Sequence, residues 1–256
     1  MESRQKNILT ILLIIIIVII AGIIGYLGFE VVNENVKEKE AGEITAEFDS
    51  VVPTISEEEW EDEYLNEDGQ IVGENQNDNG LSLSENGTDT GTTSGRTGNN
   101  SSKHTSSSSS GTRTSSASSV YINGNWVAGT ISIPATGIKY SIFAEESKQA
   151  LEKGVCILYS MAGLNRQGNT VIVGHNYRNR LFFSRNKNLN IGDKIIIKDY
   201  TGLEITYTIY NKFTADKDDA SFYQRDTAGK REITLSTCTD QGTKTGERLI
   251  LCASEV

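Results

Sequence analysis

The sequence predicts a mainly β domain, closed or nearly closed into a barrel, that is carried by one membrane-spanning helix and a long, disordered polar linker. Three observations lead to this prediction. An uncharged apolar run lies near the N-terminus, a segment rich in acids and then in Ser, Thr and Gly follows it, and the last part of the chain holds at least seven short runs rich in β-branched residues. Because a barrel removes exposed sheet edges, many short strands with few helices favour that architecture.

A transmembrane helix is predicted at residues 7–29, which contain no charged residue. At about 1.5 Å per residue, a helix of this length crosses the roughly 30 Å hydrocarbon core of a bilayer with some tilt. Basic residues precede the run and acidic residues follow it, so the positive-inside rule places residues 1–6 in the cytoplasm. No small-x-small cleavage motif follows, which indicates an uncleaved anchor. We therefore expect a single-pass protein of the plasma membrane with its folded domain on the extracellular face.

An extracellular linker is predicted at residues 30–119, acidic at first and then rich in Ser, Thr and Gly. Residues 29–80 hold 17 acidic side chains against two lysines, and so account for the chain's net charge of −10. This excess of charge indicates a solvated, extended segment, with a short helix or docking motif at 44–65 as the alternative. Residues 86–119 cannot bury enough apolar surface to offset the entropy of ordering them. As a flexible coil, the whole linker would reach roughly 50 Å.

The remaining residues, 120–256, have the length of one domain. They hold 17 basic and 14 acidic side chains, a net charge of +3, without a basic stripe, which argues against nucleic-acid binding. All three cysteines lie here, so at least one thiol stays free in an extracellular setting. Cys156 and Cys252 lie in apolar, strand-like stretches, where we expect buried thiols; a disulfide between the two is the alternative.

The strands are predicted from short runs rich in β-branched residues that are separated by Gly, Asn or Asp turns. These runs are residues 126–133, 137–143, 170–173, 194–198, 203–210, 232–238 and 248–254. A helix is predicted at 145–153, with shorter helices as candidates at 160–164 and 219–223. The sequence DYTG at 199–202 predicts a hairpin turn between two strands.

Cys238 ends one of these strands and Arg248 begins the next, with a polar, glycine-containing connection between them. An antiparallel hairpin would place the two side chains near each other at its loop end. A neighbouring cation favours the thiolate, the nucleophilic form of cysteine, and a guanidinium can hold the oxygen that becomes negative during attack on an amide. His175, the only histidine of the domain, follows an apolar strand and could give a proton to a departing amine.

Four ordered motifs resemble the sortases, the membrane-anchored cysteine transpeptidases of Gram-positive bacteria. The motifs are GTISIPATGIKYSIF at 129–143, NTVIVGHN at 169–176, ITLSTC at 233–238 and RLIL at 248–251. The resemblance implies a sortase-like β-barrel of about eight strands with a few short helices. It also implies Cys238 as the nucleophile, His175 as general acid and base, and Arg248 as the group that stabilises the oxyanion or holds the substrate.

The same resemblance implies a two-step reaction on secreted proteins that carry a C-terminal sorting signal of the LPxTG or NPxTN kind. Cys238 would form a thioacyl enzyme, and an amine of a peptidoglycan precursor or of a pilin would resolve it. TLSTC resembles class B of the family, whereas the loop lengths are closer to class A or D. No cofactor is expected; calcium held by Asp216, Asp218 and Asp219 is the alternative to a solvated turn.

Two other functions remain as alternatives. One is a membrane-anchored cell-wall module in which the cysteine, histidine and arginine are ordinary structural residues. The other is a different class of cysteine enzyme, either a cysteine hydrolase without transpeptidase activity or an L,D-transpeptidase. In an L,D-transpeptidase, the histidine lies just upstream of the cysteine. Here 63 residues separate His175 from Cys238, which argues against the L,D-transpeptidase motif.

Overall fold

The computed structural model describes residues 2–64, 119–240 and 242–256. Two helices come first, α1 (Glu2–Val51) and α2 (Glu57–Tyr64). The strands that follow are β1 (Val120–Ile122), β2 (Asn125–Ile133), β3 (Ile138–Phe143), β4 (Val155–Ser160), β5 (Gly168–Val173), β6 (Lys194–Asp199), β7 (Glu204–Ala215), β8 (Arg231–Cys238) and β9 (Arg248–Glu255). Between them lie the short helices α3 (Lys148–Leu151), η1 (Asn186–Asn188) and α4 (Gly242–Thr245). The Ser/Thr/Gly-rich part of the predicted linker, residues 65–118, lies outside the described residues.

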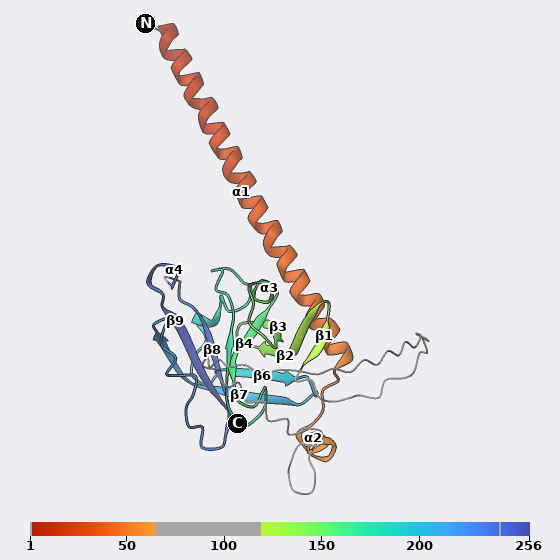
Figure 1. Ribbon diagram of the computed structural model, residues 1–256. Coiled ribbons are helices and arrows are strands. Elements are labelled where there is room, and N and C mark those ends of the chain that lie inside the picture. Colours follow the sequence, from red (N-terminus) through yellow and green to blue (C-terminus); the bar gives the residue numbers. More distant parts are fainter. Residues whose placement is uncertain (1, 65–118, 241) are drawn as a thin grey trace, which may run out of the picture. The chain divides into compact units, whose positions relative to one another are not determined.

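Strands β2 to β9 close into a barrel (Figure 1). Hydrogen-bonded neighbours follow the order β2, β3, β4, β5, β8, β9, β7, β6, and the antiparallel pairing of β6 with β2 closes the ring. β1 pairs with β2 outside this ring. Most neighbouring strands are antiparallel, but β3 with β4 and β5 with β8 are parallel. The prediction of a mainly β barrel of about eight strands is confirmed.

Each predicted strand corresponds to an observed one, and β7 continues beyond its predicted end to Ala215. The turn predicted at 199–202 joins β6 to β7, with the Gly202 N–H donating to the Asp199 carbonyl. Strand β1, which has only three residues, was not among the predicted runs. Neither was β4, although its apolar stretch around Cys156 had the composition of a strand.

The helical predictions were less accurate, because local hydrogen bonds and turns compete with short helices. The helix predicted at 145–153 is reduced to α3, where the Ser147 side chain accepts a hydrogen bond from the Ala150 N–H. Ser160 ends β4, and residues 161–164 form bends and the start of a turn rather than a helix; Gly163 there has a left-handed φ of 93°. Residues 219–223 are not helical either: only 221–223 form a turn, before which the Asp219 carboxylate accepts from the Ser221 N–H.

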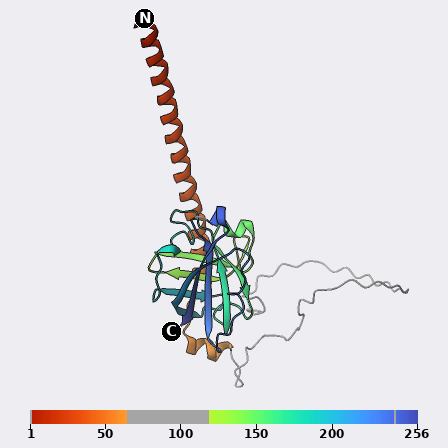
Figure 2. The ribbon, with the colours of Figure 1, turned by 90° about the vertical axis from the view of Figure 1, so that its left-hand side faces the viewer.

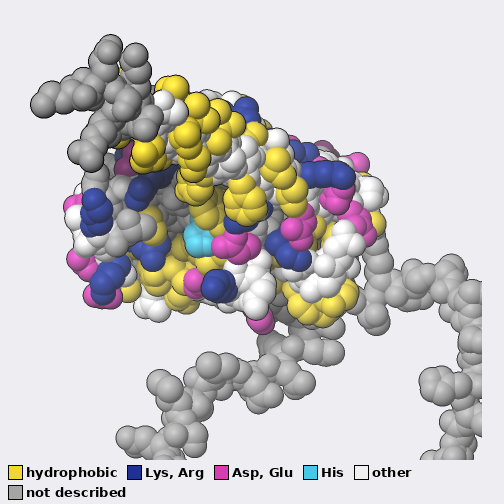
Figure 3. Space-filling model, turned by 90° about the horizontal axis from the view of Figure 1, so that it is seen from above, with side chains coloured by type: hydrophobic (Ala, Val, Ile, Leu, Met, Phe, Trp, Pro, Cys, Tyr) yellow, Lys and Arg dark blue, Asp and Glu magenta, His cyan; other side chains and the backbone are white. Residues whose placement is uncertain are grey.

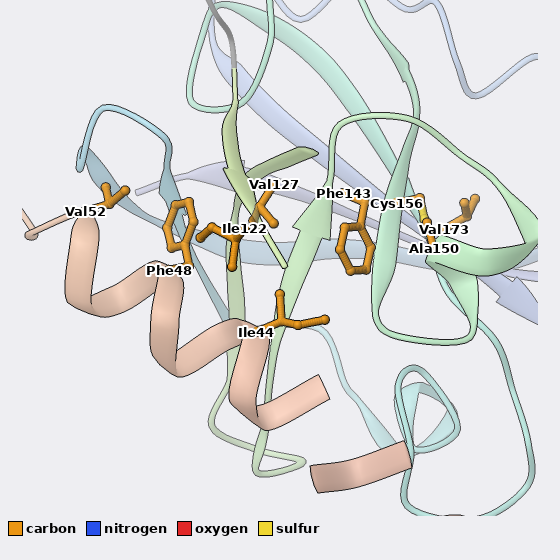
Figure 4. Packing of buried hydrophobic residues seen from close by; sticks show 9 residues of the cluster. All are labelled: Ile44, Phe48, Val52, Ile122, Val127, Phe143, Ala150, Cys156 and Val173. Atoms are coloured by element: carbon orange, nitrogen blue, oxygen red, sulfur yellow. The ribbon is translucent and has the colours of Figure 1, made fainter. Parts of the chain in front are cut away.

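The second half of α1 packs on the barrel, where the sequence predicted a solvated linker. Four apolar side chains recur there at helical spacing and are at most 4% exposed, namely Ala41, Ile44, Phe48 and Val52. In Figure 4, Ile44 and Phe48 face a cluster that includes Val127 of β2 and Phe143 of β3. The linker prediction is therefore wrong for this part of the chain. The cause is that many acids surround these few apolar residues, so the composition concealed their helical period.

The acids of this segment have partners on the barrel. Asp49 pairs with Lys139 and with Lys198, at 2.5 Å in both cases. The Lys198 side chain is only 7% exposed, and its ammonium also donates to the Val52 carbonyl. Burial would raise the pKa of Asp49, but the hydrogen bonds from the two lysines outweigh burial and hold that pKa below its ordinary value. These acids therefore contribute to docking of the helix rather than only to its solvation.

Helix α2 contacts the barrel near the C-terminus (Figure 2). Trp60 is 4% exposed and lies against the Arg166 guanidinium, which is 4.4 Å from the ring centroid. Glu57 pairs with Arg231 of β8 at 2.5 Å. The alternative of a docking motif at 44–65 is thus the one that the structure supports.

The first half of α1 has a different character. Among the described residues, α1 is the one helix long and apolar enough to cross a membrane, with a mean hydropathy of 3.1 over its most apolar 18 residues. None of these residues is buried, and Leu9, Ile16 and Phe29 are each more than half exposed. The helix is a candidate membrane span that continues without a break into the segment packed on the barrel.

Candidate active site

Cys238 and Arg248 lie opposite each other at one end of the barrel. They are the last residue of β8 and the first residue of β9, and they are direct partners in the antiparallel register. The Arg248 guanidinium Nη1 donates to the Cys238 Sγ across 3.3 Å. The hairpin predicted from the sequence is confirmed. Pairing holds the two side chains on one face because residues directly opposite each other in an antiparallel pair point to the same side of the sheet.

His175 follows β5 by two residues and is tied to the same end. Strand β5 runs parallel to β8, with Val173 beside Ser236. The Thr237 hydroxyl donates to the Gly174 carbonyl at 2.7 Å, and the Asn176 side-chain amide donates to the Cys238 carbonyl at 2.9 Å. The residues on both sides of His175 are therefore bonded to the end of β8.

The imidazole of His175 is half-buried, and this burial lowers its pKa below the ordinary histidine value. The positive charges of Lys37 and Arg248 act in the same direction, whereas the carboxylate of Glu152 opposes them. His175 is consequently mostly neutral at pH 7, when it can accept a proton. Figure 3 shows the histidine, in cyan, exposed on this face with an acidic side chain beside it.

The family model of the Sortase domain matches residues 131–256. These residues form a sortase domain. The three residues that the sequence singled out, Cys238, His175 and Arg248, all lie within it.

Solved sortase structures cover about half of this chain. Sortase C1 of Streptococcus agalactiae is 21% identical over 51% of this chain and 69% of its own, with a TM-score of 0.46. Sortase A of Listeria monocytogenes is 25% identical over 51% and 87%, with a TM-score of 0.45. Sortase C of Clostridium perfringens, solved with the C-terminal cell wall sorting motif, is 24% identical over 51% and 70%, with a TM-score of 0.45. Among curated proteins no match was found.

A second group of polar residues, from α1 and from the sortase domain, lies at His175, and the sequence did not single it out. Glu152, just after α3, places Oε1 4.0 Å from the His175 Nε2. The ring of Tyr177 lies on His175 with 5.0 Å between ring centroids. Lys37 of α1 forms an ion pair with Glu152 and donates to the Tyr177 hydroxyl at 3.3 Å. Of this group, only Tyr177, in the sequence NYR, lies directly after His175. Lys37 and Glu152 are 115 residues apart, so no local sequence pattern connects them.

The other two cysteines of the sortase domain are buried and unpaired. Cys156 lies in the cluster on which α1 packs, and Cys252 lies in a separate cluster with Val171 and Ile250. Burial raises the pKa of Cys156 to about 12 and raises that of Cys252 as well. The expectation of buried free thiols is confirmed, and no disulfide joins them.

The carboxylates of the acidic loop suggested for calcium make local contacts within the loop. Asp216 accepts from the Asp218 N–H, Asp219 accepts from the Ser221 N–H, and Asp218 pairs with Lys217. Within the described ranges, no group of three or more His, Cys, Asp or Glu side chains is arranged to hold a metal ion. Calcium binding at this loop gains no support from the geometry.

Proposed function

We propose that this protein is a sortase-type cysteine transpeptidase in which Cys238 is the nucleophile, His175 the general acid and base, and Arg248 the oxyanion-stabilising or substrate-holding group. One observation carries the proposal. The only cysteine that is not buried has a guanidinium 3.3 Å from its sulfur, at the barrel end to which the His175 loop is tied. The family match of residues 131–256 supports the same function.

In the first step, the Cys238 sulfur attacks the carbonyl carbon of an amide in the sorting signal. The S–C bond forms as His175 accepts the thiol proton, and the Arg248 guanidinium holds the oxygen that becomes negative. When the C–N bond breaks, His175 returns the proton to the departing amine. The products are a thioester on Cys238 and the released C-terminal peptide.

In the second step, an acceptor amine attacks the thioester. His175 accepts the amine proton, the C–S bond breaks, and the proton returns to the sulfur, so the enzyme is regenerated with its thiol. The new bond is an amide between the cleaved protein and the acceptor. The lowered pKa of His175 suits both steps, because a neutral imidazole is needed at the moment when each proton leaves its nucleophile.

The proposed substrates are secreted proteins with a C-terminal sorting signal of the LPxTG or NPxTN kind. The proposed acceptor is an amine of a peptidoglycan precursor or of a pilin. Residues 7–29 would anchor the enzyme in the plasma membrane as a single span, with the sortase domain on the extracellular face. Support for this placement comes from the exposed apolar half of α1 and from the basic residues that precede it.

The test is intact-mass spectrometry of the full chain in detergent, incubated with sorting-signal peptides of both kinds, with and without an amine acceptor. The wild type should gain the mass of the acyl fragment, and the amine should convert this adduct to a new amide product. Cys238→Ala should show neither species. Cys252→Ala, which removes another thiol of the same domain, should behave as the wild type.

Each alternative function gives its own result in this experiment. A cysteine hydrolase would form the adduct on Cys238 but would release only the free acid, whatever amine is added. A non-catalytic cell-wall module would form no adduct with any peptide. Either result would contradict the proposed transpeptidase.

A further inference from the structure

We propose that Lys37, on the helix that would leave the membrane, is a positioning residue for His175, acting through the Glu152 carboxylate and the Tyr177 ring. Lys37 does not touch the reacting atoms itself. It binds both groups that lie against the imidazole, and it is part of the same continuous helix as the candidate membrane span.

Glu152 lies between Lys37 and His175. Its Oε2 carries the ion pair with Lys37, while its Oε1 lies 4.0 Å from the His175 Nε2. The hydrogen bond from Lys37 is the main reason that the pKa of Glu152 is below its ordinary value. The carboxylate therefore stays ionised but is already paired, so it does not need the imidazole as its counter-ion.

Tyr177 also contacts both Lys37 and His175. The Lys37 ammonium lies over the Tyr177 ring, 4.5 Å from its centroid, and also donates to its hydroxyl. The same ring contacts His175 at a tilt of 46°. Tyr177 also helps to hold the pKa of Glu152 below its ordinary value. Lys37 thus fixes both neighbours of the imidazole.

Removal of Lys37 would change the charges around His175. Glu152 would lose its ion pair with Lys37, and its other partner that can carry a positive charge, among the described residues, is the imidazole of His175, 4.0 Å away. An unpaired carboxylate at this distance stabilises the protonated ring. The charged or titratable groups that act on His175 come from several elements, namely Lys37, Glu146, Glu152 and Arg248. Of these, only Glu152 forms an ion pair with Lys37.

Lys37 lies on α1 between the apolar run and the part of the helix that packs on the barrel. Lys37 lies eight residues after Phe29, or about 12 Å along a helix from the end of the apolar run. Farther along the same helix, Asp49 contacts the barrel through Lys139 and Lys198. Docking of the membrane-proximal helix and placement of His175 are consequently one structural event. The consequence for catalysis rests on the proposed role of His175, but the effect on its imidazole does not.

The experiment follows the His175 ring directly, by NMR of the full chain in detergent micelles with ¹³Cε1-labelled histidine. The chain has two histidines, so His104→Gln assigns the signals and His104 serves as an internal reference. Lys37→Met keeps the side-chain length without the charge. We expect it to raise the pKa of His175 by roughly one unit and to leave that of His104 unchanged. Lys37→Arg should restore the wild-type value.

Two matched controls separate this role from general effects of charge or docking. Lys39→Met removes a lysine of the same helix that pairs only with Glu43, and Lys153→Met removes the barrel partner of Glu40. Neither should change the pKa of His175 by more than a few tenths of a unit. In a Glu152→Gln background, Lys37→Met should no longer raise it.

Three results would overturn the proposal. They are an unchanged His175 pKa in Lys37→Met, an equal rise in Lys153→Met, and a rise that persists in the Glu152→Gln background. A separate measurement, the pH dependence of kcat/KM, tests the consequence for function. The acid limb of the kcat/KM profile should move to higher pH in Lys37→Met by the same amount as the NMR value. Absence of transpeptidation in the wild type would contradict the proposed function but would leave the NMR result intact.

Discussion

The two sides of the site at His175 have different origins. On one side, Cys238 and Arg248 are ten residues apart in sequence and are partners in one hairpin. On the other side, Lys37 and Glu152 are 115 residues apart and meet only because α1 packs on the barrel. The difference shows that Cys238 and Arg248 are placed by local strand pairing, whereas the environment of the imidazole depends on long-range docking.

The forces that hold the two sides differ as well. Backbone hydrogen bonds of β8 with β5 and β9 fix the barrel side. Apolar burial and ion pairs fix the helical side, through residues such as Phe48 and Asp49. The two sides can therefore be perturbed separately, and substitutions on each side should affect different measurements.

The largest effect is expected from Phe48→Ala on the helical side. Phe48 is fully buried, and truncation would remove most of its apolar contact and leave a cavity under α1. Such truncations cost about 3–5 kcal/mol. Thermal unfolding of the full chain in detergent measures the loss, with Val36→Ala as the control because Val36 is 58% exposed on the same helix. Equal losses from the two variants would contradict docking of the helix as described.

On the barrel side, the largest effect on the reaction is expected from Arg248→Ala. The guanidinium donates to the Cys238 sulfur at 3.3 Å, so its loss should lower kcat by roughly 10²–10³-fold. Arg248→Lys keeps the charge without the planar fork and should recover only part of the rate. Acyl-enzyme formation by mass spectrometry measures both.

Arg180→Ala is the matched control for this arginine. Arg180 is exposed and lies 3.9 Å from Glu34 of α1, on the helical side of the site. Its loss should change acylation by less than about twofold, because exposed ion pairs contribute little. A fall as large as that of Arg248→Ala would mean that net positive charge, and not contact with the sulfur, governs the rate.

The same difference explains how much the sequence could predict. Strand periodicity predicted the barrel, and alternation along two strands predicted that Cys238 and Arg248 meet. Nothing local in the sequence connects Lys37 with Glu152, since their contact depends on where a helix lands on a barrel. A helical period was present in Ile44, Phe48 and Val52, but the surrounding acids favoured the interpretation as linker.

A moderate effect is expected from Asp49→Asn, which leaves the largely buried Lys198 without its carboxylate partner. The loss of stability should be about 1–3 kcal/mol at neutral pH. Because the folded pKa of Asp49 is lower than its unfolded value, its contribution is present above about pH 4 and is lost as the pH falls through the folded pKa.

Unfolding of wild type and Asp49→Asn should therefore be compared between neutral pH and about pH 3. The stability difference should shrink as the pH falls. Asp218→Asn is the control, since Asp218 pairs with Lys217 at the surface and its side chain is 77% exposed. A difference between wild type and Asp49→Asn that stays constant with pH would show that the carboxylate charge does not hold α1 on the barrel.

The smallest effect is expected from Asn176→Ala, which removes the bond between the His175 loop and the Cys238 carbonyl. One hydrogen bond is worth about 0.5–1.5 kcal/mol, so acylation should slow by roughly 2- to 12-fold, and the unfolding temperature should fall by only a few degrees. Asn190→Ala, in a surface turn, should leave the rate unchanged. If Asn176→Ala also acylates at the wild-type rate, the parallel pairing of β5 with β8, together with the bond from the Thr237 hydroxyl to the Gly174 carbonyl, is sufficient to place His175. The Asn176 side chain would then not be needed as a tether on the barrel side.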